Sequence, residues 1–142
     1  MGNQSRGVPV LKKMLLAAFA TLLGSIAVAH HSGAMFDRSK TLTLKGTVKE
    51  FQYTNPHSWL QVLVTGADGK TVEWGFESEG PSTLMRVGIQ AGTFKRGDTV
   101  TVLANPMRDG RPAGALLSVT MANGKVYSTR AGPPPPTAAT KG

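Results

Sequence analysis

Five segments between residues 42 and 121 alternate apolar and polar side chains at every second position, which is the pattern of half-buried β-strands. In the first of them, "TLTLKGTVKEF", apolar residues occupy one face until the phase changes at Phe51. A bulge near Lys49 and Glu50 would restore the alternation and bend the strand. The sequence therefore predicts a mainly β protein whose strands curl.

The other strands follow from the same alternation. Residues 59–64 and 71–77 predict a hairpin, because Asp68 and Gly69 tolerate the positive φ angles of a tight turn. Residues 99–104 and 113–121 predict two further strands, the second with Leu117, Val119 and Met121 facing inward. Residues 105–112 between them read as a loop, and residues 125–127 as a short additional strand.

A short helix is predicted at residues 81–87, because Pro81 suits a first helical position and Gly88 suits a C-terminal cap. Five strands with one helix between the third and the fourth is the order of the OB-fold, a small Greek-key barrel. An immunoglobulin-like sandwich needs about seven strands and has no such helix, so it fits less well.

The two ends of the chain differ from this body. Residues 1–29 have a basic start and an apolar stretch that ends in Ala-Val-Ala, which predicts a signal helix that is cut after Ala29 or, less readily, after Ala27. The apolar stretch is shorter than the ~20 residues that span a bilayer, so we expect a periplasmic or secreted protein with no stable membrane anchor. Residues 128–142 are rich in proline and predict a disordered tail, which leaves residues 30–127 as one barrel domain.

Charge and cysteine usage narrow the function. The chain has 16 basic and 8 acidic side chains, but three of the basic ones lie in the leader and two in the tail, which leaves 11 against 8 in the barrel domain. This mild excess is not the footprint of a nucleic-acid-binding protein. The chain contains no cysteine, so packing or a bound ligand must hold the barrel together.

Several short motifs occur together in this chain: His30-His31-Ser32, Phe36-Asp37, Asn55-Pro56-His57, Trp74, Gly97-Asp98 and "NPMRDGR". In this order the set resembles a family of small exported bacterial proteins known only as a domain of unknown function. The resemblance covers about residues 30–127 and implies a stand-alone OB-like barrel. It implies no established activity, so it assigns no catalytic residue.

The three histidines are candidate metal ligands. Cleavage after Ala29 would give His30 a free amine beside its ring, and with His57 these nitrogens could form a copper "histidine brace". Cleavage after Ala27 would instead leave Val28-Ala29-His30, another chelate for Cu(II). We therefore predict His30, His31 and His57 as metal ligands, copper first. The alternative is that no metal binds and that Asn-Pro-His is a turn.

A ligand-binding surface is the second candidate site. The OB-fold binds ligands on its second and third strands and on nearby loops, which points to Asn55, His57 and Trp59. Glu73 and Glu77 have the parity of an exposed strand face, so they are expected to be solvated. No catalytic motif is present, and no catalytic residue is predicted.

These observations favour an exported, non-catalytic binding module whose ligand is copper or a small anionic or sugar-like molecule. Two alternatives remain open. One is a copper redox enzyme built on a histidine brace. The other is an accessory protein that binds a periplasmic partner through a strand edge or the proline-rich tail.

Overall fold

The structure, a computed structural model, describes residues 32–130. The predicted leader, His30, His31 and residues 131–142 lie outside the described residues. Within the described part, Ser32–Met35 forms a single 3-10 turn, η1. No helix among residues 32–130 is long and apolar enough to cross a membrane. The account below concerns the compact unit that begins at Phe36.

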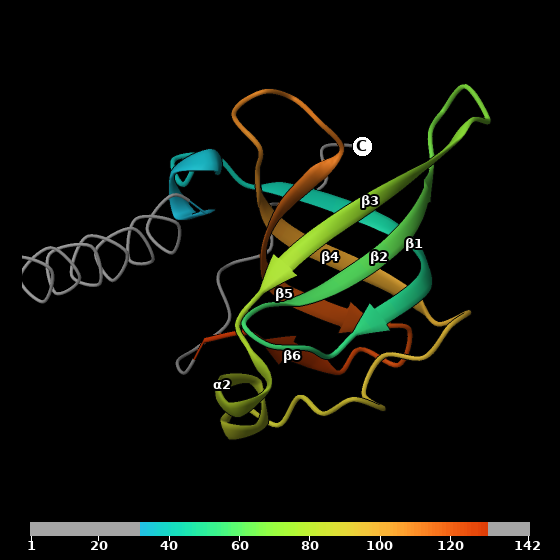
Figure 1. Cartoon of the computed structure of the whole chain (residues 1–142). Helices are drawn as coiled ribbons and strands as arrows, with labels where there is room; N and C mark the ends of the chain where they lie inside the picture. Colours follow the sequence, from blue (N-terminus) through green and yellow to red (C-terminus); the bar gives the residue numbers. More distant parts are fainter. Residues whose placement is uncertain (1–31, 131–142) are drawn as a thin grey trace, which may run out of the picture. The chain divides into compact units, whose positions relative to one another are not determined.

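Six strands and one short helix make up this unit (Figure 1). The elements in chain order are β1 (Leu42–Gln52), β2 (Ser58–Thr65), β3 (Thr71–Ser78), α2 (Pro81–Arg86), β4 (Thr99–Pro106), β5 (Ala113–Met121) and β6 (Val126–Ser128). The sheet order is β3-β2-β1-β4-β5-β6, and a parallel pairing of β3 with β5 closes five of the strands into a barrel. The predicted five-stranded OB-like Greek-key barrel, with one helix between the third and fourth strands, is confirmed.

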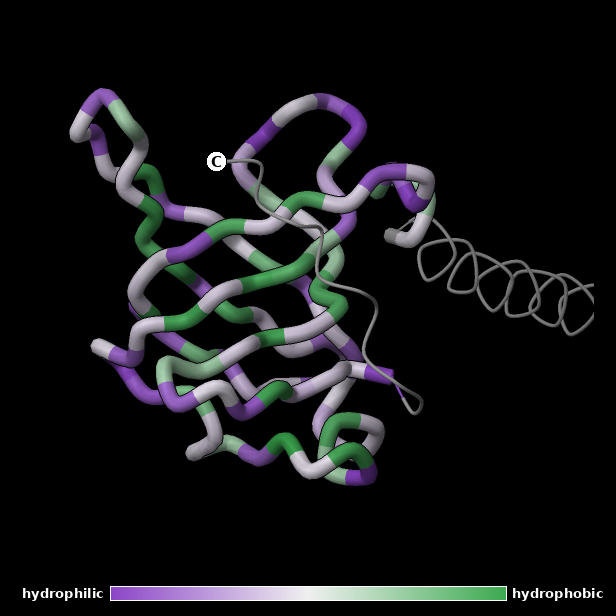
Figure 2. Tube along the Cα trace, turned by 180° about the vertical axis from the view of Figure 1, so that it is seen from behind, coloured by the Kyte–Doolittle hydropathy of each residue, from purple (hydrophilic) through white to green (hydrophobic). Residues whose placement is uncertain are grey.

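The inward residues of all five barrel strands fill the interior. Along each strand, hydrophobic positions alternate with polar ones (Figure 2). The segment that connects β3 to β4 adds three apolar side chains, of which Leu84 comes from α2. The fully packed cluster is Val48, Leu60, Val62, Phe76, Leu84, Ile89, Phe94, Val100, Val102, Ala104, Leu116 and Val119. The barrel is therefore a filled core rather than a pore.

Two bulges decide which residues of the long strands face this core. The register of β1 against β2 shifts between Val48 and Glu50, so the bulge predicted near Lys49 is confirmed. A second shift occurs opposite Leu103 and Ala104, where β5 contains one extra residue. As a result Leu116, not Leu117, lies in the core, and the prediction that Leu117 faces inward was wrong. Alternation alone does not reveal a bulge between two adjacent leucines.

Thr129 holds the second bulge in place. Its backbone N–H donates to the carbonyl of Leu117 at 3.0 Å, and its hydroxyl donates to the carbonyl of Leu116 at 2.8 Å. Thr129 is buried, and Ser128 belongs to β6. The predicted boundary after residue 127 is therefore too early, because these backbone carbonyls need a donor from the chain beyond β6.

The predicted loop at residues 105–112 also begins later than expected. Asn105 and Pro106 continue β4, since they pair with Ala115 and Gly114 of β5. Phe36 is buried and forms a bridge with Met107, while the N–H of Asp37 donates to the carbonyl of Pro106 at 2.8 Å. We name residues 36–40 the N-terminal latch. The Phe36-Asp37 motif therefore has a structural role, which is to fasten the start of the chain to β4.

The β2–β3 hairpin differs in detail from the predicted tight turn. Thr65 pairs with Thr71, and the N–H of Gly66 donates to the carbonyl of Lys70 at 2.8 Å, which leaves a loop of three residues between them. Gly69 has a φ of 78°, whereas Asp68 does not have a positive φ. This loop pairs Trp59 with Glu77, a register that a two-residue turn at Asp68 and Gly69 would shift by one position.

The latch predicts an acid-sensitive contribution to stability. The pKa of Asp37 is lowered from 3.8 to about 2, first because the Ser39 hydroxyl donates to its carboxylate and then because Lys40 also donates. A lowered pKa means that the folded state favours the ionised carboxylate, so its stabilisation is complete above pH 3.8 and is lost as the pH falls toward 2. Melting temperatures of the parent and of Asp37→Asn should differ at neutral pH and converge near pH 2. A constant difference across this range would contradict the assignment.

Candidate functional site

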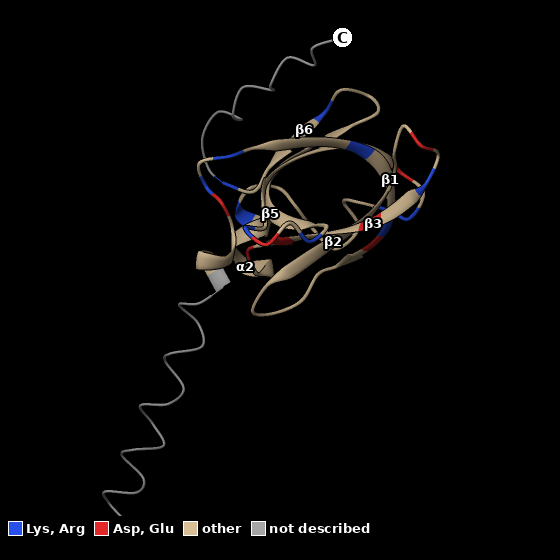
Figure 3. Ribbon diagram, turned by 90° about the horizontal axis from the view of Figure 1, so that it is seen from above, with Lys and Arg blue, Asp and Glu red and all other residues tan. Residues whose placement is uncertain are grey.

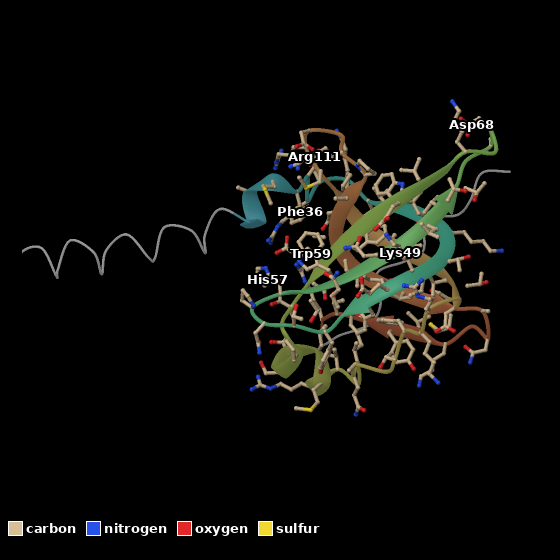
Figure 4. All side chains as sticks on the ribbon, turned by 45° about the vertical axis from the view of Figure 1, so that its right-hand side comes forward. Phe36, Lys49, His57, Trp59, Asp68 and Arg111 are labelled. Atoms are coloured by element: carbon tan, nitrogen blue, oxygen red, sulfur yellow. The ribbon has the colours of Figure 1, made fainter. Side chains whose placement is uncertain are left out.

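The outer surface of β1, β2 and β3 carries the most chemically varied side chains of the barrel. Strand pairing arranges them in two rows: Glu50, Gln61 and Gly75 in one, and Gln52, Trp59 and Glu77 in the next. We name these six residues the β2–β3 face. His57 borders the face at one end, and Lys49 lies farther along the same strands (Figure 4).

Trp59 packs against Gly75 at the centre of this face, with one edge of its six-membered ring nearest the glycine. A Cβ atom placed on Gly75 would be 3.7 Å from Cε3 and Cζ3 of the indole and 3.0 Å from Oε1 of Gln61. No backbone atom is among these nearest neighbours of Gly75, so it is side chains that fill the volume above this glycine. The indole therefore packs against the sheet at Gly75, and it is only partly buried.

A carboxylate and an imidazole meet beside this tryptophan. Nδ1 of His57 contacts Oε1 of Glu77, whose side chain is only 9% exposed, while that of His57 is 38% exposed. Glu77 is also the cross-strand partner of Trp59. The expectation that Glu77 is solvated was wrong, because its neighbours on both sides cover it. Since Nδ1 faces Glu77, Nε2 is the ring nitrogen that His57 can offer to a ligand.

The loop before β2 positions His57. The peptide bond between Asn55 and Pro56 is cis, and the Thr54 hydroxyl donates to the carbonyl of His57 at 3.1 Å. At the start of β2, the N–H of Ser58 donates to the carbonyl of Glu79 at 3.3 Å. These bonds hold the loop against the end of β3 and place the imidazole over Glu77.

Charged side chains border the face as pairs. Lys49 reaches Glu73 at 2.5 Å, and Arg111 reaches Asp109 at 2.7 Å within the loop that precedes β5. That loop adjoins the face, because the N–H of Gly75 donates to the carbonyl of Pro112 at 3.1 Å. Acidic and basic residues are scattered over the strands and loops rather than separated by sign (Figure 3). The border of the face is therefore charged, yet its charges compensate one another.

The structure brings together two of the three predicted ligand-binding residues. His57 and Trp59 share the β2–β3 face and meet at Glu77. Asn55 instead lies near the start of α2, where its Oδ1 would be 3.1 Å from a Cβ atom on Gly80. Asn55 therefore packs the turn against Gly80 and does not belong to the β2–β3 face.

The structure describes only one of the three predicted metal ligands. His57 is described, whereas His30 and His31 lie outside the described residues. Among residues 32–130, no group of three or more histidine, aspartate and glutamate side chains is arranged to hold a metal ion. The copper site therefore stays a prediction that depends on ligands beyond this part of the chain.

Sequence reasoning missed Gln61, Gly75 and Glu77 as members of the face. Register was the signal that could have found them, because a hairpin with a three-residue loop places Glu77 opposite Trp59 and Gly75 opposite Gln61. A glycine in the middle of a strand is itself informative, since it weakens the strand and marks a place where another group approaches closely.

A second hollow lies on the wall made by β1, β4 and β5. Its lining consists of Lys45, Thr99, Val100, Thr101, Thr120, Met121 and Ala122. These side chains offer one amine and several hydroxyls but no aromatic ring or buried carboxylate. The β2–β3 face is therefore the stronger candidate.

Comparison with known proteins identifies a family without a described activity. The model of a family of unknown function (DUF6152) matches residues 19–117, which is more than half of the chain. No curated protein matches the chain, and no solved structure matches it. The resemblance to a domain of unknown function is thereby confirmed.

The His57–Glu77 contact predicts an asymmetry between two ion pairs. Replacing His57 with alanine leaves a buried carboxylate without its partner, so the free energy of unfolding should fall by about 1–2 kcal/mol. Replacing Lys49 with alanine should cost no more than about 0.5 kcal/mol, because Lys49 and Glu73 are both more than two-fifths exposed. Urea denaturation at pH 7 measures both values.

The double variant His57→Ala/Glu77→Ala is the control for this comparison. It removes the unpaired carboxylate and should recover part of the loss. Equal effects of the two single substitutions, or no recovery in the double variant, would contradict the assigned role of the pair.

Proposed function

Because the chain belongs to the DUF6152 family of unknown function, we propose its function from the geometry of the barrel. It is a non-catalytic binding module that holds a ring-shaped polar ligand against Trp59 on the β2–β3 face. The observation that carries this proposal is the partly buried indole packed against Gly75, with its Cε3 and Cζ3 atoms 3.7 Å from the position of a Cβ.

Stacking on such a ring is an effective way to bind a flat ligand. Stacking on an aromatic ring contributes about 0.5–1.5 kcal/mol beyond the free energy gained by burying apolar area, since the electron-rich face of the ring attracts the positive edges of other groups. Gln61 and Gln52 flank Trp59 and supply amide donors and acceptors, which fix a ligand's orientation. An apolar platform with a few convergent polar groups is the usual composition of a small-molecule site.

The predicted leader supports the same proposal, because it indicates where the protein works. Residues 1–29 combine a basic start, an apolar stretch and a small-x-small end, so the module works in the periplasm or outside the cell after cleavage. A small exported barrel with an exposed aromatic platform suits the capture of a soluble ligand.

Copper binding is the second candidate, and the His57–Glu77 contact is the observation that favours it. Metal-ligating histidines almost always donate their other ring N–H to a carboxylate or carbonyl, which fixes the orientation of the ligating nitrogen. His57 has this arrangement, with Nδ1 toward Glu77 and Nε2 left over. His30 and His31, with the amine that cleavage would free, are the further ligands of this proposal.

The copper candidate predicts two linked results. The intact mass of the exported protein should correspond to a chain that begins at His30. Titration of this material with Cu(II) should then show one site that is weakened at least about tenfold, or 1.4 kcal/mol, by His57→Ala. A mature chain that begins elsewhere ends the brace version. Equal affinity in the parent and in His57→Ala removes His57 as a ligand.

The binding module predicts a response that is confined to one of the two tryptophans. Indole N–H signals in NMR spectra, assigned with Trp59→Phe and Trp74→Phe, should respond to a ring-shaped ligand only at Trp59. Trp74 is the internal control, because its ring stacks on Phe76 at 6.1 Å within the barrel. The test set contains neutral oligosaccharides, acidic oligosaccharides, oligonucleotides and small aromatic acids. If no class shifts the Trp59 signal, the proposed function is wrong.

A further inference from the structure

We infer that the ligand of the β2–β3 face is an uncharged oligosaccharide, a conclusion that rests on the proposed binding function. The juxtaposition that carries it is an indole platform set between two glutamine amides and two carboxylates, with bordering cations that are already paired. Each part of this arrangement selects against one alternative class of ligand and fits a sugar ring.

The platform itself fits a sugar. A pyranose has one face made of C–H groups, and these weakly positive hydrogens are attracted to the electron-rich face of an aromatic ring. Trp59 packs against Gly75 through Cε3 and Cζ3 and is only partly buried, so the exposed part of its ring is the surface that a sugar can cover. A nucleobase would also stack there, so charge must decide between the two.

The charges on the face disfavour an anionic ligand. Glu50 belongs to the face and accepts a hydrogen bond from Gln52 at 3.1 Å, and Glu77 lies directly opposite Trp59. A phosphate or uronate on the indole would lie near the carboxylate of Glu50, which bonds to an uncharged amide, and like charges at such short range repel. Glu77 adds less to this repulsion, because it is buried and contacts His57.

The cations on the border do not offset this repulsion. Lys49 is paired with Glu73 and Arg111 with Asp109, so the charges of these two cations are already compensated within the protein. Proteins that bind nucleic acids instead align uncompensated Lys and Arg along the phosphate backbone.

The polar groups match the hydroxyls of a sugar. Carboxylates accept hydrogen bonds from hydroxyl groups, and a glutamine amide both donates and accepts, so neighbouring hydroxyls find partners without any net charge. Gln52 lies beside Trp59 in the same row, and Gln61 and Glu50 lie in the adjoining row. A neutral polyol with an apolar ring face satisfies the platform and these polar groups at once.

The length of the face indicates more than one sugar ring. From His57 at one border to Leu63, where the Lys49–Glu73 pair crosses β2 at the other, the chain extends six residues, or about 20 Å at about 3.3 Å per residue. Affinity should therefore rise with the number of sugar units. Trp59 lies near the His57 end of this stretch and would hold the terminal or penultimate ring.

The test is a titration of the processed, isotope-labelled protein, followed at the two indole N–H signals. The neutral probes are cellotetraose, chitotetraose and maltotetraose, with the matching monosaccharides. The charged probes are tetragalacturonate and an oligothymidylate. We expect at least one neutral tetrasaccharide to shift the Trp59 signal with a Kd at or below about 1 mM, and its monosaccharide to bind at least about tenfold more weakly.

Three variants make the result specific. Because Trp59→Ala removes the reporting indole, the Kd of each variant is measured by isothermal titration calorimetry. Trp59→Ala should weaken binding at least about tenfold, whereas Trp74→Phe should leave the Kd within about twofold. Gly75→Val is the second route to the same site, because its side chain would displace the indole and the Gln61 amide from the outside without touching the core. Gly75→Val should also weaken binding. An unchanged Trp74 signal in Trp59→Ala and in Gly75→Val shows that the barrel is folded.

Each other outcome overturns the inference in a recognisable way. If the charged probes shift Trp59 and the neutral ones do not, the ligand is not a neutral sugar, although the binding function stands. If a neutral tetrasaccharide binds equally well to Trp59→Ala and Gly75→Val, the sugar is held elsewhere. If no probe shifts Trp59, this inference fails, and the proposed function fails with it when the small aromatic acids also leave Trp59 unshifted.

Discussion

The parallel pairing of β3 with β5 is the interaction on which the rest of the structure depends. It is short, joining Gly75, Phe76 and Glu77 to residues 113–115, yet it turns an open sheet into a closed barrel. Closure removes the strand edges that an open sheet would expose and gives the interior a continuous wall around Phe76. Two of these three residues, Gly75 and Glu77, belong to the β2–β3 face. The segment that closes the fold therefore also supplies the glycine against which Trp59 packs and the carboxylate beside it.

Curvature comes from two places where the strands break their alternation. The bulge at Lys49 bends β1 so that its first half pairs with β4 and its second half with β2. The bulge at Leu117 turns β5 so that it pairs first with β3 and then with β6. Each bulge leaves backbone groups that need partners, and Thr129 supplies two of them for β5. A barrel of this size can close only because such local irregularities are satisfied by hydrogen bonds from distant parts of the chain.

The contribution of each charged pair on the barrel surface to stability depends on how deeply the pair is buried. Lys49 and Glu73 form a pair that is largely exposed, so water competes with it and its contribution is small. Glu77 is buried beside Trp59, so the imidazole of His57 is its necessary partner. The face therefore combines an aromatic platform with charges that are held within the protein. That combination suits recognition by shape and hydrogen bonding more than attraction of an oppositely charged partner.

The sequence by itself determined the class and the order of this fold. Alternation identified the five barrel strands and the bulge near Lys49, and proline and glycine marked the helix between the third and fourth strands, because these signals are local to each segment. The sequence predicted only part of the site: it indicated His57 and Trp59, but it predicted a solvated Glu77 and gave no role to Gly75. Only the tertiary structure decided that Leu116 replaces Leu117 in the core, that β4 continues through Pro106, and that Glu77 lies under His57 beside Trp59. Each of these depends on which residue of another strand lies opposite, and register between strands is set by loop length and bulges rather than by the pattern within one strand.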